Sequence, residues 1–514
     1  MTMIMKKIYA IFAAAAATFA LAASCNKIET NEPGSEPVNG PAEGVKVNIT
    51  VGSLTPDTKA VKTGWENGDI IHVYLDDAST YTPDFDLTYD GSKWSASTLS
   101  AAVIDRLKED GTGYIRGFWE ESNYCMTGSS WDKYSYVIEF PGTANYGTTG
   151  ITSRLVADFH GIKYTYDKAA GTLTASIGTW RFRSNFQLVV NGLDFEAGRY
   201  TLYSDDVANL HMILIETSGT AEDKDCQASY YGTGSAYGRI AGIQNADGVA
   251  FVGAFSTSSY IAGETLTFYL IDNTTGVKYE FTKTLAATLS TPDTKVTAIR
   301  VPFSKFVVDM GLSVKWAACN LGAATVTGYG DYYAWGETEP YYEDGYADEN
   351  PQTHWKTGKT GYDWASYQWT TDGGSSFTKY TGSDYDTLQA ADDAATAAYG
   401  SPYRMPTDAE FQELLNASNC DGEWVANYLS TGVNGYLFTG KKSGYESQKL
   451  FLPAAGYRYY TYLFSVGSNG DYWSSSLSTG YPDGAWSVFF NSVNVYRGSY
   501  DRYGGQSVRP VFAE

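Results

Sequence analysis

The sequence predicts a mainly β protein, and three observations lead to that fold class. Short alternating or apolar runs recur along the chain, turn-forming residues separate them, and few helical patterns occur. Aromatic residues make up 15% of the 514 residues, and most are tyrosines, which suit sheets better than helical bundles. A chain of this length holds about two to four domains with filled cores. We therefore expect β-sandwich domains.

The strand candidates lie mostly in the first 300 residues. Residues 45–51 alternate strictly, which is the pattern of a strand with one solvated face. Further candidates are Ile70–Leu75, Tyr136–Phe140, Phe186–Val190, Met212–Ile215, Leu266–Ile271 and Lys278–Phe281. Turn signals separate them at Asn67–Asp69, Asp90–Gly91, Asn191–Gly192 and Asn273–Gly276. This spacing predicts two β-sandwich domains, residues 45–177 and 178–303.

The N-terminal residues have the features of a secretory signal. Lys6 and Lys7 precede an apolar run from Ile8 to Ala20, which is too short for a membrane span. Leu21-Ala22-Ala23-Ser24-Cys25 follows and resembles a bacterial lipoprotein signal. The resemblance implies removal of residues 1–24 and acylation of Cys25, which would tether the protein firmly to a membrane. Residues 25–44 are rich in Asn, Glu, Pro, Gly and Ser, and we expect a flexible leash.

Charge and cysteine content exclude several classes of function. The formal net charge of −22 opposes binding to nucleic acid or to anionic lipid. Beyond Cys25 four cysteines remain, Cys125, Cys226, Cys319 and Cys420, and their spacing does not choose among the three pairings. The sequence has no CxxC motif and no Cys/His cluster, so we expect no zinc site.

Short pieces of residues 45–303 resemble a known family. Thr58-Lys59-Ala60 and the segment Trp65–Tyr74 are similar to the opening of fimbrillin-like proteins of Bacteroidota. Ile261–Phe268 and Gly276–Tyr279 resemble the end of their second sandwich. The resemblance covers residues 45–303 and implies two fimbrillin-like sandwiches. A generic surface β-sandwich without a role in polymerisation is the alternative.

The last 211 residues, 304–514, resemble a different family. Six pieces occur in order: Val308–Ala323, Gly330–Thr338, Asp392–Ala397, Arg404–Phe411, Phe451–Arg458 and Tyr472–Ser476. Together with Ser507–Val511 they are similar to the Fibrobacter major paralogous domain, a C-type-lectin-like or formylglycine-enzyme-like module. The resemblance implies an α+β C-type-lectin-like fold for residues 304–514.

Local signals place two helices and two turns in this domain. Thr407-Asp408-Ala409-Glu410 reads as a capping box, and Phe411, Leu414 and Leu415 would form one apolar helix face. A second helix is expected from about Leu388 to Tyr399. Asn434-Gly435 and Asn469-Gly470 read as hairpin turns.

No catalytic motif was found in the sequence. GxSxG, P-loop and HExxH patterns are absent, and His72, His160, His211 and His354 are scattered singly. Formylglycine-type enzymes use a reactive cysteine pair, but neither Cys319 nor Cys420 lies in a matching motif. We expect these two cysteines to form a structural disulfide or to remain two buried thiols. The calcium-ligand motifs of C-type lectins are incomplete, so no cofactor and no metal is expected.

The remaining candidate site is the stretch from Tyr329 to Tyr380, which is long and rich in aromatic residues. A disordered loop would be poor in aromatics, whereas aromatic faces stack on sugars and grip protein surfaces. We expect ligand contact from Trp355, Trp364, Trp369, Tyr341 and Tyr342. The alternative is that these rings pin the loop to its own domain, which is the role we expect of Trp335 and Trp473.

These observations lead to one expected function and two alternatives. The first is a non-enzymatic, lipid-anchored adhesin of the outer membrane, exposed on the cell surface or on fimbriae. It would act as a fimbrial tip or accessory subunit, with other pilin subunits as partners, and its C-terminal domain would bind a glycan or a surface protein. The alternatives are a glycan-capture lipoprotein for nutrient uptake and a formylglycine-type enzyme.

Overall fold

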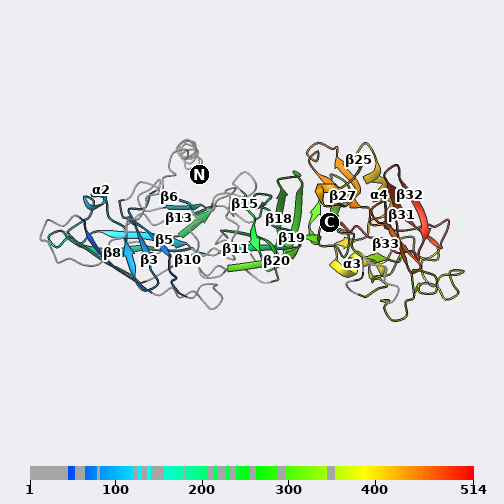
Figure 1. Cartoon of the computed structure of the whole chain (residues 1–514), viewed down its shortest axis with the longest axis horizontal. Helices are drawn as coiled ribbons and strands as arrows, with labels where there is room; N and C mark the ends of the chain where they lie inside the picture. The colour runs from blue at the N-terminus through cyan, green and yellow to red at the C-terminus, as the bar shows by residue number, and fades with distance from the viewer. Residues whose placement is uncertain are drawn as a thin grey trace. The chain divides into compact units, whose positions relative to one another are not determined.

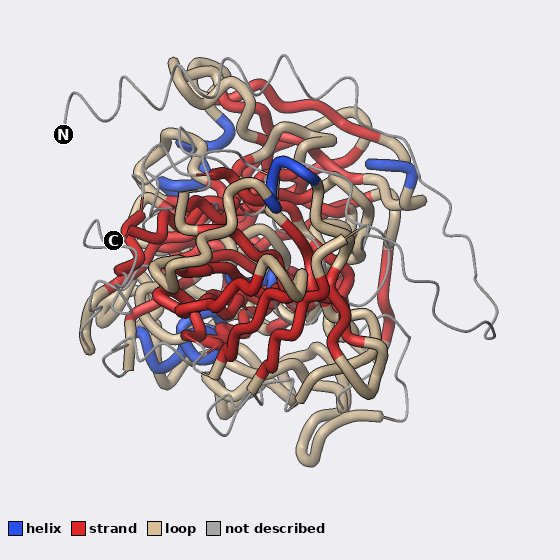
Figure 2. The backbone as a smooth tube through the Cα atoms, turned by 90° about the vertical axis from the view of Figure 1, so that its left-hand side faces the viewer, coloured by secondary structure: helices blue, strands red, loops and turns tan. Residues whose placement is uncertain are grey.

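A computed structural model describes most of the chain beyond the expected leash. The described residues are 44–52, 64–77, 82–120, 126–129, 136–139, 156–178, 181–183, 185–206, 212–216, 227–230, 239–254, 262–286, 296–343, 346 and 354–513. The expected signal peptide, Cys25, Cys125 and Cys226 lie outside them. Strands far outnumber helices, as the red segments of Figure 2 show, and the mainly β prediction is confirmed. No helix among the described residues is long and apolar enough to cross a membrane.

The first sheet contains residues from 46 to 183. Its order is β1-β9-β8-β5-β2-β3-β4, with β10 paired to β8. The strands are β1 (Lys46–Val51), β2 (Ile70–Leu75), β3 (Phe85–Tyr89), β4 (Trp94–Ala96), β5 (Tyr114–Glu120), β8 (Val156–Asp167), β9 (Thr172–Ile177) and β10 (Arg181–Arg183). A short helix, α2 (Ala101–Ile104), is capped by Ser100. The alternation predicted for residues 45–51 is present in β1, an edge strand that runs parallel to β9.

Two four-stranded sheets follow. One has the order β14-β13-β7-β6, and the other has the order β16-β17-β11-β20. Their strands are β6 (Met126–Ser129), β7 (Tyr136–Glu139), β11 (Asn185–Asn191), β13 (Met212–Glu216), β14 (Gln227–Tyr230), β16 (Ile243–Asn245), β17 (Gly248–Ala254) and β20 (Val296–Pro302). Because β7 pairs with β13, strands from both sides of residue 177 share one sheet. The boundary at residues 177/178 stays a prediction.

One eight-stranded sheet continues across residues 303/304, where the sequence predicts a domain boundary. Its order is β15-β12-β18-β19-β21-β22-β34-β24. The strands are β12 (Tyr200–Ser204), β15 (Ile240–Ala241), β18 (Thr265–Asp272), β19 (Lys278–Thr284), β21 (Val307–Val308), β22 (Lys315–Ala317), β24 (Tyr403–Arg404) and β34 (Val511–Phe512). The hairpin of β18 and β19, drawn side by side in green in Figure 1, turns at Asn273–Gly276 as predicted.

One hydrophobic core accompanies this continuous sheet. Leu270 and Phe281 from the preceding strands belong to the same buried cluster as Trp316, Phe411 and Phe490. A short 3-10 turn, η2 (Phe303–Lys305), links β20 to β21. Residues 304–513 are therefore joined to the preceding region by both backbone pairing and shared packing.

The remaining sheets belong to residues 304–513. A five-stranded sheet has the order β23-β33-β30-β31-β32, a three-stranded sheet has the order β25-β26-β27, and β28 pairs with β29. The strands are β23 (Tyr332–Tyr333), β25 (Cys420–Val425), β26 (Gly435–Gly440), β27 (Lys449–Pro453), β28 (Tyr457–Tyr459), β29 (Tyr462–Phe464), β30 (Asn469–Leu477), β31 (Gly484–Asn491), β32 (Val495–Asp501) and β33 (Gln506–Ser507).

The helices of this region follow the sequence signals closely. In α4 (Asp408–Leu415) the capping box is present: Glu410 N donates to Thr407 Oγ1, and Thr407 N donates to the Glu410 carboxylate. The single helix expected from Leu388 is corrected to a 3-10 turn, η3 (Ala390–Asp392), and a short helix, α3 (Ala394–Tyr399). Asp393 separates them because its extended backbone and its side chain cap α3.

Neither Asn-Gly pair forms the expected two-residue hairpin turn. Gly435 opens β26 and Gly470 lies in β30. A Cβ on Gly435 would lie 2.3 Å from the Leu452 carbonyl oxygen, and one on Gly470 would lie 2.0 Å from the Phe490 ring. These glycines therefore permit close packing inside sheets.

Candidate functional site

The structure places the two tyrosines of the expected site inside the protein. Tyr341 is 0% exposed and Tyr342 is 1% exposed. The Tyr341 ring stacks on Tyr362 with centroids 4.5 Å apart, and the Tyr342 hydroxyl accepts a hydrogen bond from Tyr332 N at 2.7 Å. Rings buried to this degree do not reach a surface ligand, so both fill the interior of the domain.

The three tryptophans of the expected site are half-buried and pack on their own domain. Trp364 meets Tyr503 edge to face at 4.6 Å, and Trp369 Nε1 donates to the Gly336 carbonyl at 2.8 Å. Trp355 lies edge to face with Tyr362 at 6.1 Å. These contacts match the alternative in which the rings pin the loop to its domain.

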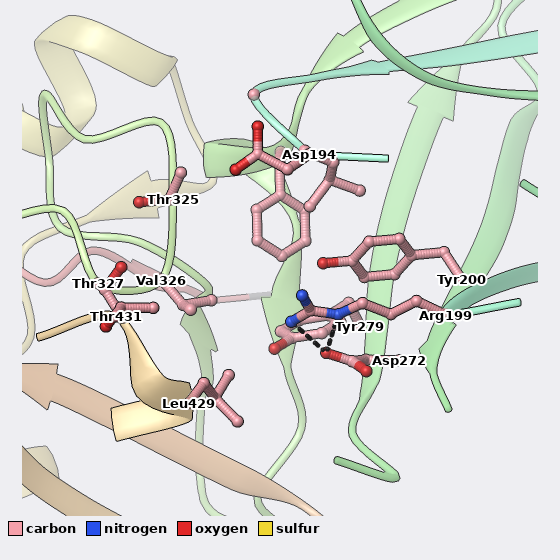
Figure 3. Close-up of a pocket in the computed structure, with 13 residues that line it drawn as sticks. Asp194, Arg199, Tyr200, Asp272, Tyr279, Thr325, Val326, Thr327, Leu429 and Thr431 are labelled. Carbon is pink, nitrogen blue, oxygen red and sulfur yellow. Dashed lines mark hydrogen bonds and ion pairs between the residues drawn. The ribbon is translucent and has the colours of Figure 1, made fainter. Parts of the chain in front are cut away.

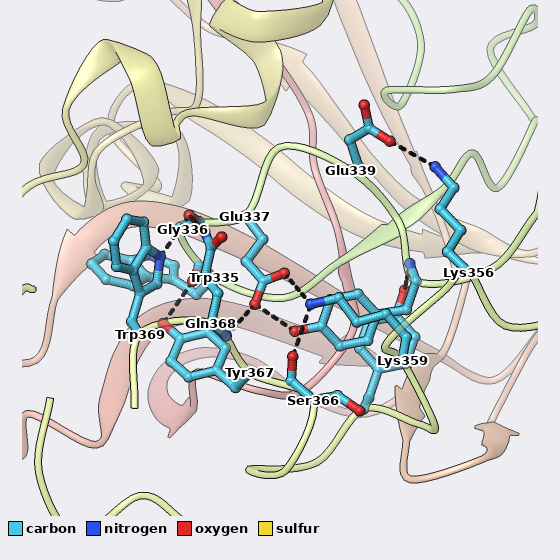
Figure 4. A network of polar contacts seen from close by, with 12 residues as sticks. Trp335, Gly336, Glu337, Glu339, Lys356, Lys359, Ser366, Tyr367, Gln368 and Trp369 are labelled. Atoms are coloured by element: carbon cyan, nitrogen blue, oxygen red, sulfur yellow. Dashed lines mark hydrogen bonds and ion pairs between the residues drawn. The ribbon is translucent and has the colours of Figure 1, made fainter. Parts of the chain in front are cut away.

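A buried ionic network adds to this anchoring. The Glu337 carboxylate is 6% exposed and lies 2.8 Å from Lys359 Nζ, as Figure 4 shows. It also accepts hydrogen bonds from the Tyr341 hydroxyl at 2.6 Å and from Gln368 N at 2.9 Å. The Lys359 ammonium lies 3.8 Å from the Tyr341 ring centroid. Because each charge has several partners, this part of the loop is structural rather than open to a ligand.

Cys319 and Cys420 are two buried free thiols, which is the second of the two expected alternatives. Burial raises the pKa of Cys319 to about 12 and the pKa of Cys420 to about 11. A thiol with a raised pKa is protonated at neutral pH and is a poor nucleophile.

Several exposed aromatic residues lie together on the β28–β29 hairpin. Tyr457 pairs with Phe464 and Tyr459 pairs with Tyr462, so these four side chains project from the same face. We call Tyr457, Tyr459, Tyr462 and Phe464 the aromatic face. The last three are 36%, 49% and 39% exposed. On the opposite face, Arg458 is fully buried.

An open cavity of about 350 Å³ adjoins the aromatic face, and we call it the aromatic cavity. Its size lies near the lower end of the range for ligand sites, about 300–1,000 Å³. Four rings line it, from Tyr457, Tyr459, Phe489 and Tyr500. Its polar lining includes Asn469, Asp471, Asp501 and Gln506. Aromatic walls with a few polar groups are typical of small-molecule and sugar sites.

The sheet register explains how these groups converge. Asp471 on β30 lies opposite Phe489 on β31, and Phe489 lies opposite Tyr496 on β32, so the three share one sheet face. Further along β32, the Tyr500 ring covers Gly498, because a Cβ built at Gly498 would lie 2.9 Å from Tyr500 Cε2. The absence of a side chain at residue 498 therefore sets the position of one cavity wall.

Asp471 is the most unusual polar group of the aromatic cavity. Its side chain is 3% exposed, and no donor among the described residues reaches its Oδ2. Burial raises the pKa of Asp471 to about 7. A buried carboxyl oxygen without a partner costs about 1–3 kcal/mol, and such a cost is commonly found at functional sites.

The sequence carries one local signal for this site. Residues 457–464 read Tyr-Arg-Tyr-Tyr-Thr-Tyr-Leu-Phe, and alternating aromatic residues predict a strand with an aromatic face. Asp471 carried no signal of its own, because its burial depends on the packing of β28 against β30.

A second, smaller cavity of about 120 Å³ lies between loops of the continuous sheet and residues 325–327 and 429–431. As Figure 3 shows, Arg199 reaches into it and forms an ion pair with Asp272, at 3.1 Å. Asp194 also lines this cavity. Because the cavity is small and Arg199 is already paired with Asp272, it is the weaker candidate. Among the described residues, no group of three or more His, Cys, Asp or Glu side chains could hold a metal ion.

No protein-family model matches this chain, and no curated protein sequence matches it.

Proposed function

We propose that this protein is a non-catalytic adhesion protein that binds a saccharide in the aromatic cavity. The observation that carries the proposal is the position of the aromatic face beside a cavity with carboxyl and amide groups. Sugar rings pack their C–H faces on aromatic rings, while carboxylates and amides accept or donate hydrogen bonds to sugar hydroxyls. The exposed aromatic face continues from the cavity and offers contact to a second sugar unit.

The proposal includes display on the outer membrane through acylated Cys25. Its support is the Leu-Ala-Ala-Ser-Cys pattern at residues 21–25. In a fimbria the protein would act as a tip or accessory subunit, following the resemblance to fimbrillins. The position of β34 between β22 and β24 supports this role, because an internal strand is not free to pair with another subunit.

A non-catalytic role is supported by the two thiols of residues 304–513. An enzyme of formylglycine type needs a reactive cysteine, whereas burial keeps Cys319 and Cys420 protonated.

Glycan-array screening of the full mature chain tests the proposal. We expect binding to a set of saccharides, and a loss of at least about tenfold in affinity for Tyr459→Ala or Tyr462→Ala, because aromatic anchors dominate binding energy. Tyr481→Ala is the control, since Tyr481 is 71% exposed and does not line the cavity. Unchanged binding in both hairpin variants would show that the site is wrong.

Gly498→Ala provides a test that removes no contact group. The added methyl would displace the Tyr500 ring, so affinity should fall while the melting temperature changes little.

A separate experiment tests the fimbrial role. Recovery of pilins with the intact lipoprotein from cells would distinguish a fimbrial subunit from a nutrient-capture protein.

A further inference from the structure

We infer that the saccharide bound in the aromatic cavity carries a protonated amino group, with Asp471 as its counter-ion. This inference rests on the proposed function and names the class of sugar: a hexosamine unit with a free amine. The evidence for this inference is the arrangement of charged groups and aromatic rings around the aromatic cavity.

The first argument is the missing partner of Asp471. Buried carboxylates in folded proteins are paired or hydrogen-bonded, because an isolated charge loses its hydration without compensation. Asp471 Oδ2 has no hydrogen-bond partner among the described residues, although the side chain is almost fully buried. A ligand ammonium supplies both the opposite charge and up to three N–H donors.

The second argument is the sign of the other charges around the cavity. Asp501 on β32 adds a second carboxylate to the lining. The one cationic residue of the lining is Arg458, and its guanidinium lies over the rings of Tyr332 and Tyr342, at 5.1 and 4.8 Å from their centroids. Those rings belong to the interior cluster rather than to the cavity lining. Apart from Arg458, the charged groups of the lining are therefore the two carboxylates, Asp471 and Asp501.

The third argument comes from the aromatic walls. A cation over the face of a tyrosine or phenylalanine is attracted by the ring quadrupole. Tyr457 and Tyr459 on β28, Phe489 on β31 and Tyr500 on β32 surround the same space as Asp471. Rings and carboxylates together suit a unit with an apolar ring face and an ammonium group, which describes a hexosamine.

The alternative is a neutral sugar that accepts a hydrogen bond from protonated Asp471. The pH dependence of affinity distinguishes this arrangement from the ammonium–carboxylate pair. The pKa of Asp471 is raised to about 7 by burial. An ammonium ligand needs the ionised carboxylate, so its affinity should rise between pH 5.5 and 7. A neutral ligand held by the protonated carboxyl should lose affinity as pH rises above 7. The other groups around Asp471 are Asp501, the three tyrosines, the Gln506 amide and Arg458.

The experiment measures binding of two tetrasaccharides to the full mature chain by calorimetry. One is β-1,4-linked glucosamine and the other is its fully N-acetylated form. We expect the amine form to bind at least about tenfold more tightly at pH 7, because truncating one partner of a buried charge pair has effects of this size or larger. Asp471→Asn should abolish that preference while retaining the affinity for the N-acetylated form.

Two controls separate this inference from general attraction to an acidic protein. Asp483→Asn removes an exposed carboxylate outside the cavity and should preserve the preference. Cadaverine, which has ammonium groups but no sugar ring, should compete poorly. If cadaverine competes as well as the tetrasaccharide, or Asp471→Asn keeps the preference, the inference is wrong.

The outcomes also distinguish this inference from the proposed function. Equal binding of the two tetrasaccharides would overturn the inference and leave saccharide binding intact. Failure to bind either one, together with an empty glycan array, would overturn the proposed function and the inference with it.

Discussion

Lys315 Nζ lies 2.7 Å from Glu280 Oε1, and this ion pair joins β22 to β19 beside the backbone pairing of β21. Both side chains are mostly buried, at 20% and 9% exposure. The contact spans the point at which the sequence predicts a domain boundary. Residues 304–513 are therefore not expected to behave as an independent domain.

Lys315→Met should destabilise the whole protein. The substitution leaves the Glu280 carboxylate mostly buried without its cation, which costs about 2–4 kcal/mol of unfolding free energy. Chemical denaturation measures this change. Lys441→Met is the matched control: the Lys441–Asp421 pair is exposed, so its loss should cost at most about 1 kcal/mol. Equal effects of the two substitutions would contradict the prediction.

Phe306→Ala should destabilise the strands before residue 304 and those after it together. Phe306 is 0% exposed and packs 5.3 Å from Phe281 and 5.7 Å from Phe303, measured between ring centroids. The cavity left behind should cost about 3–5 kcal/mol. Hydrogen exchange should then increase both in β18–β19 and in β22, because they share one core. An increase confined to residues 304–513 would show that the two parts unfold separately.

Asp471 should make stability depend on pH. The pKa of Asp471 is raised to about 7 in the folded protein, against about 3.9 in an unfolded chain. Between these values the folded state holds a proton that the unfolded state has lost, so the unfolding free energy falls as pH rises from 4 to 7. The loss amounts to at most about 4 kcal/mol.

Asp471→Asn removes this dependence and provides the measurement. The variant should gain stability relative to the natural protein as pH rises from 4 to 8, and urea denaturation at several pH values would show it. If the difference between the two proteins stays constant over that range, Asp471 does not titrate as its burial implies.

Lys359→Met should destabilise the stretch from Tyr329 to Tyr380 around the Glu337 network. The substitution deprives buried Glu337 of its cation, and the remaining hydrogen bonds from Tyr341 and Gln368 compensate only in part. We expect a loss of about 2–4 kcal/mol and faster hydrogen exchange in residues 359–369. Lys356→Met is the control, because the partner of Lys356 is Glu339, which is 74% exposed. Similar exchange in both variants would contradict a structural role for the Glu337 network.

Sequence patterns with a short range predicted local structure well. The strand at Ile70–Leu75 and the capping box at Thr407 and Glu410 depend on neighbouring residues only, and the structure contains both. The Asn-Gly signal failed at Gly435 and Gly470 because packing against distant residues, rather than turn geometry, requires glycine there. The periodicity of a sequence likewise does not predict which distant strands pair, and the continuous sheet is built from such pairs.

The candidate site was only partly accessible to sequence reasoning. Aromatic density led to the prediction of a site in residues 329–380, but it could not distinguish inward rings from outward ones. Tyr341 faces inward because the Glu337 network draws its hydroxyl into the interior, whereas Tyr462 faces outward because Arg458 and Leu463 occupy the opposite face of the hairpin. That choice depends on tertiary partners far away in the chain.

The internal position of β34 also has a consequence for how the sheet forms. Val511 pairs with Trp316 on one side and Arg404 on the other, so β34 joins two strands that lie far apart in the sequence. This part of the sheet cannot close until those long-range pairs are made, and long-range pairing is slow compared with the closure of a local hairpin. A chain truncated before residue 511 would leave the facing edges of β22 and β24 unpaired, and unpaired strand edges invite aggregation.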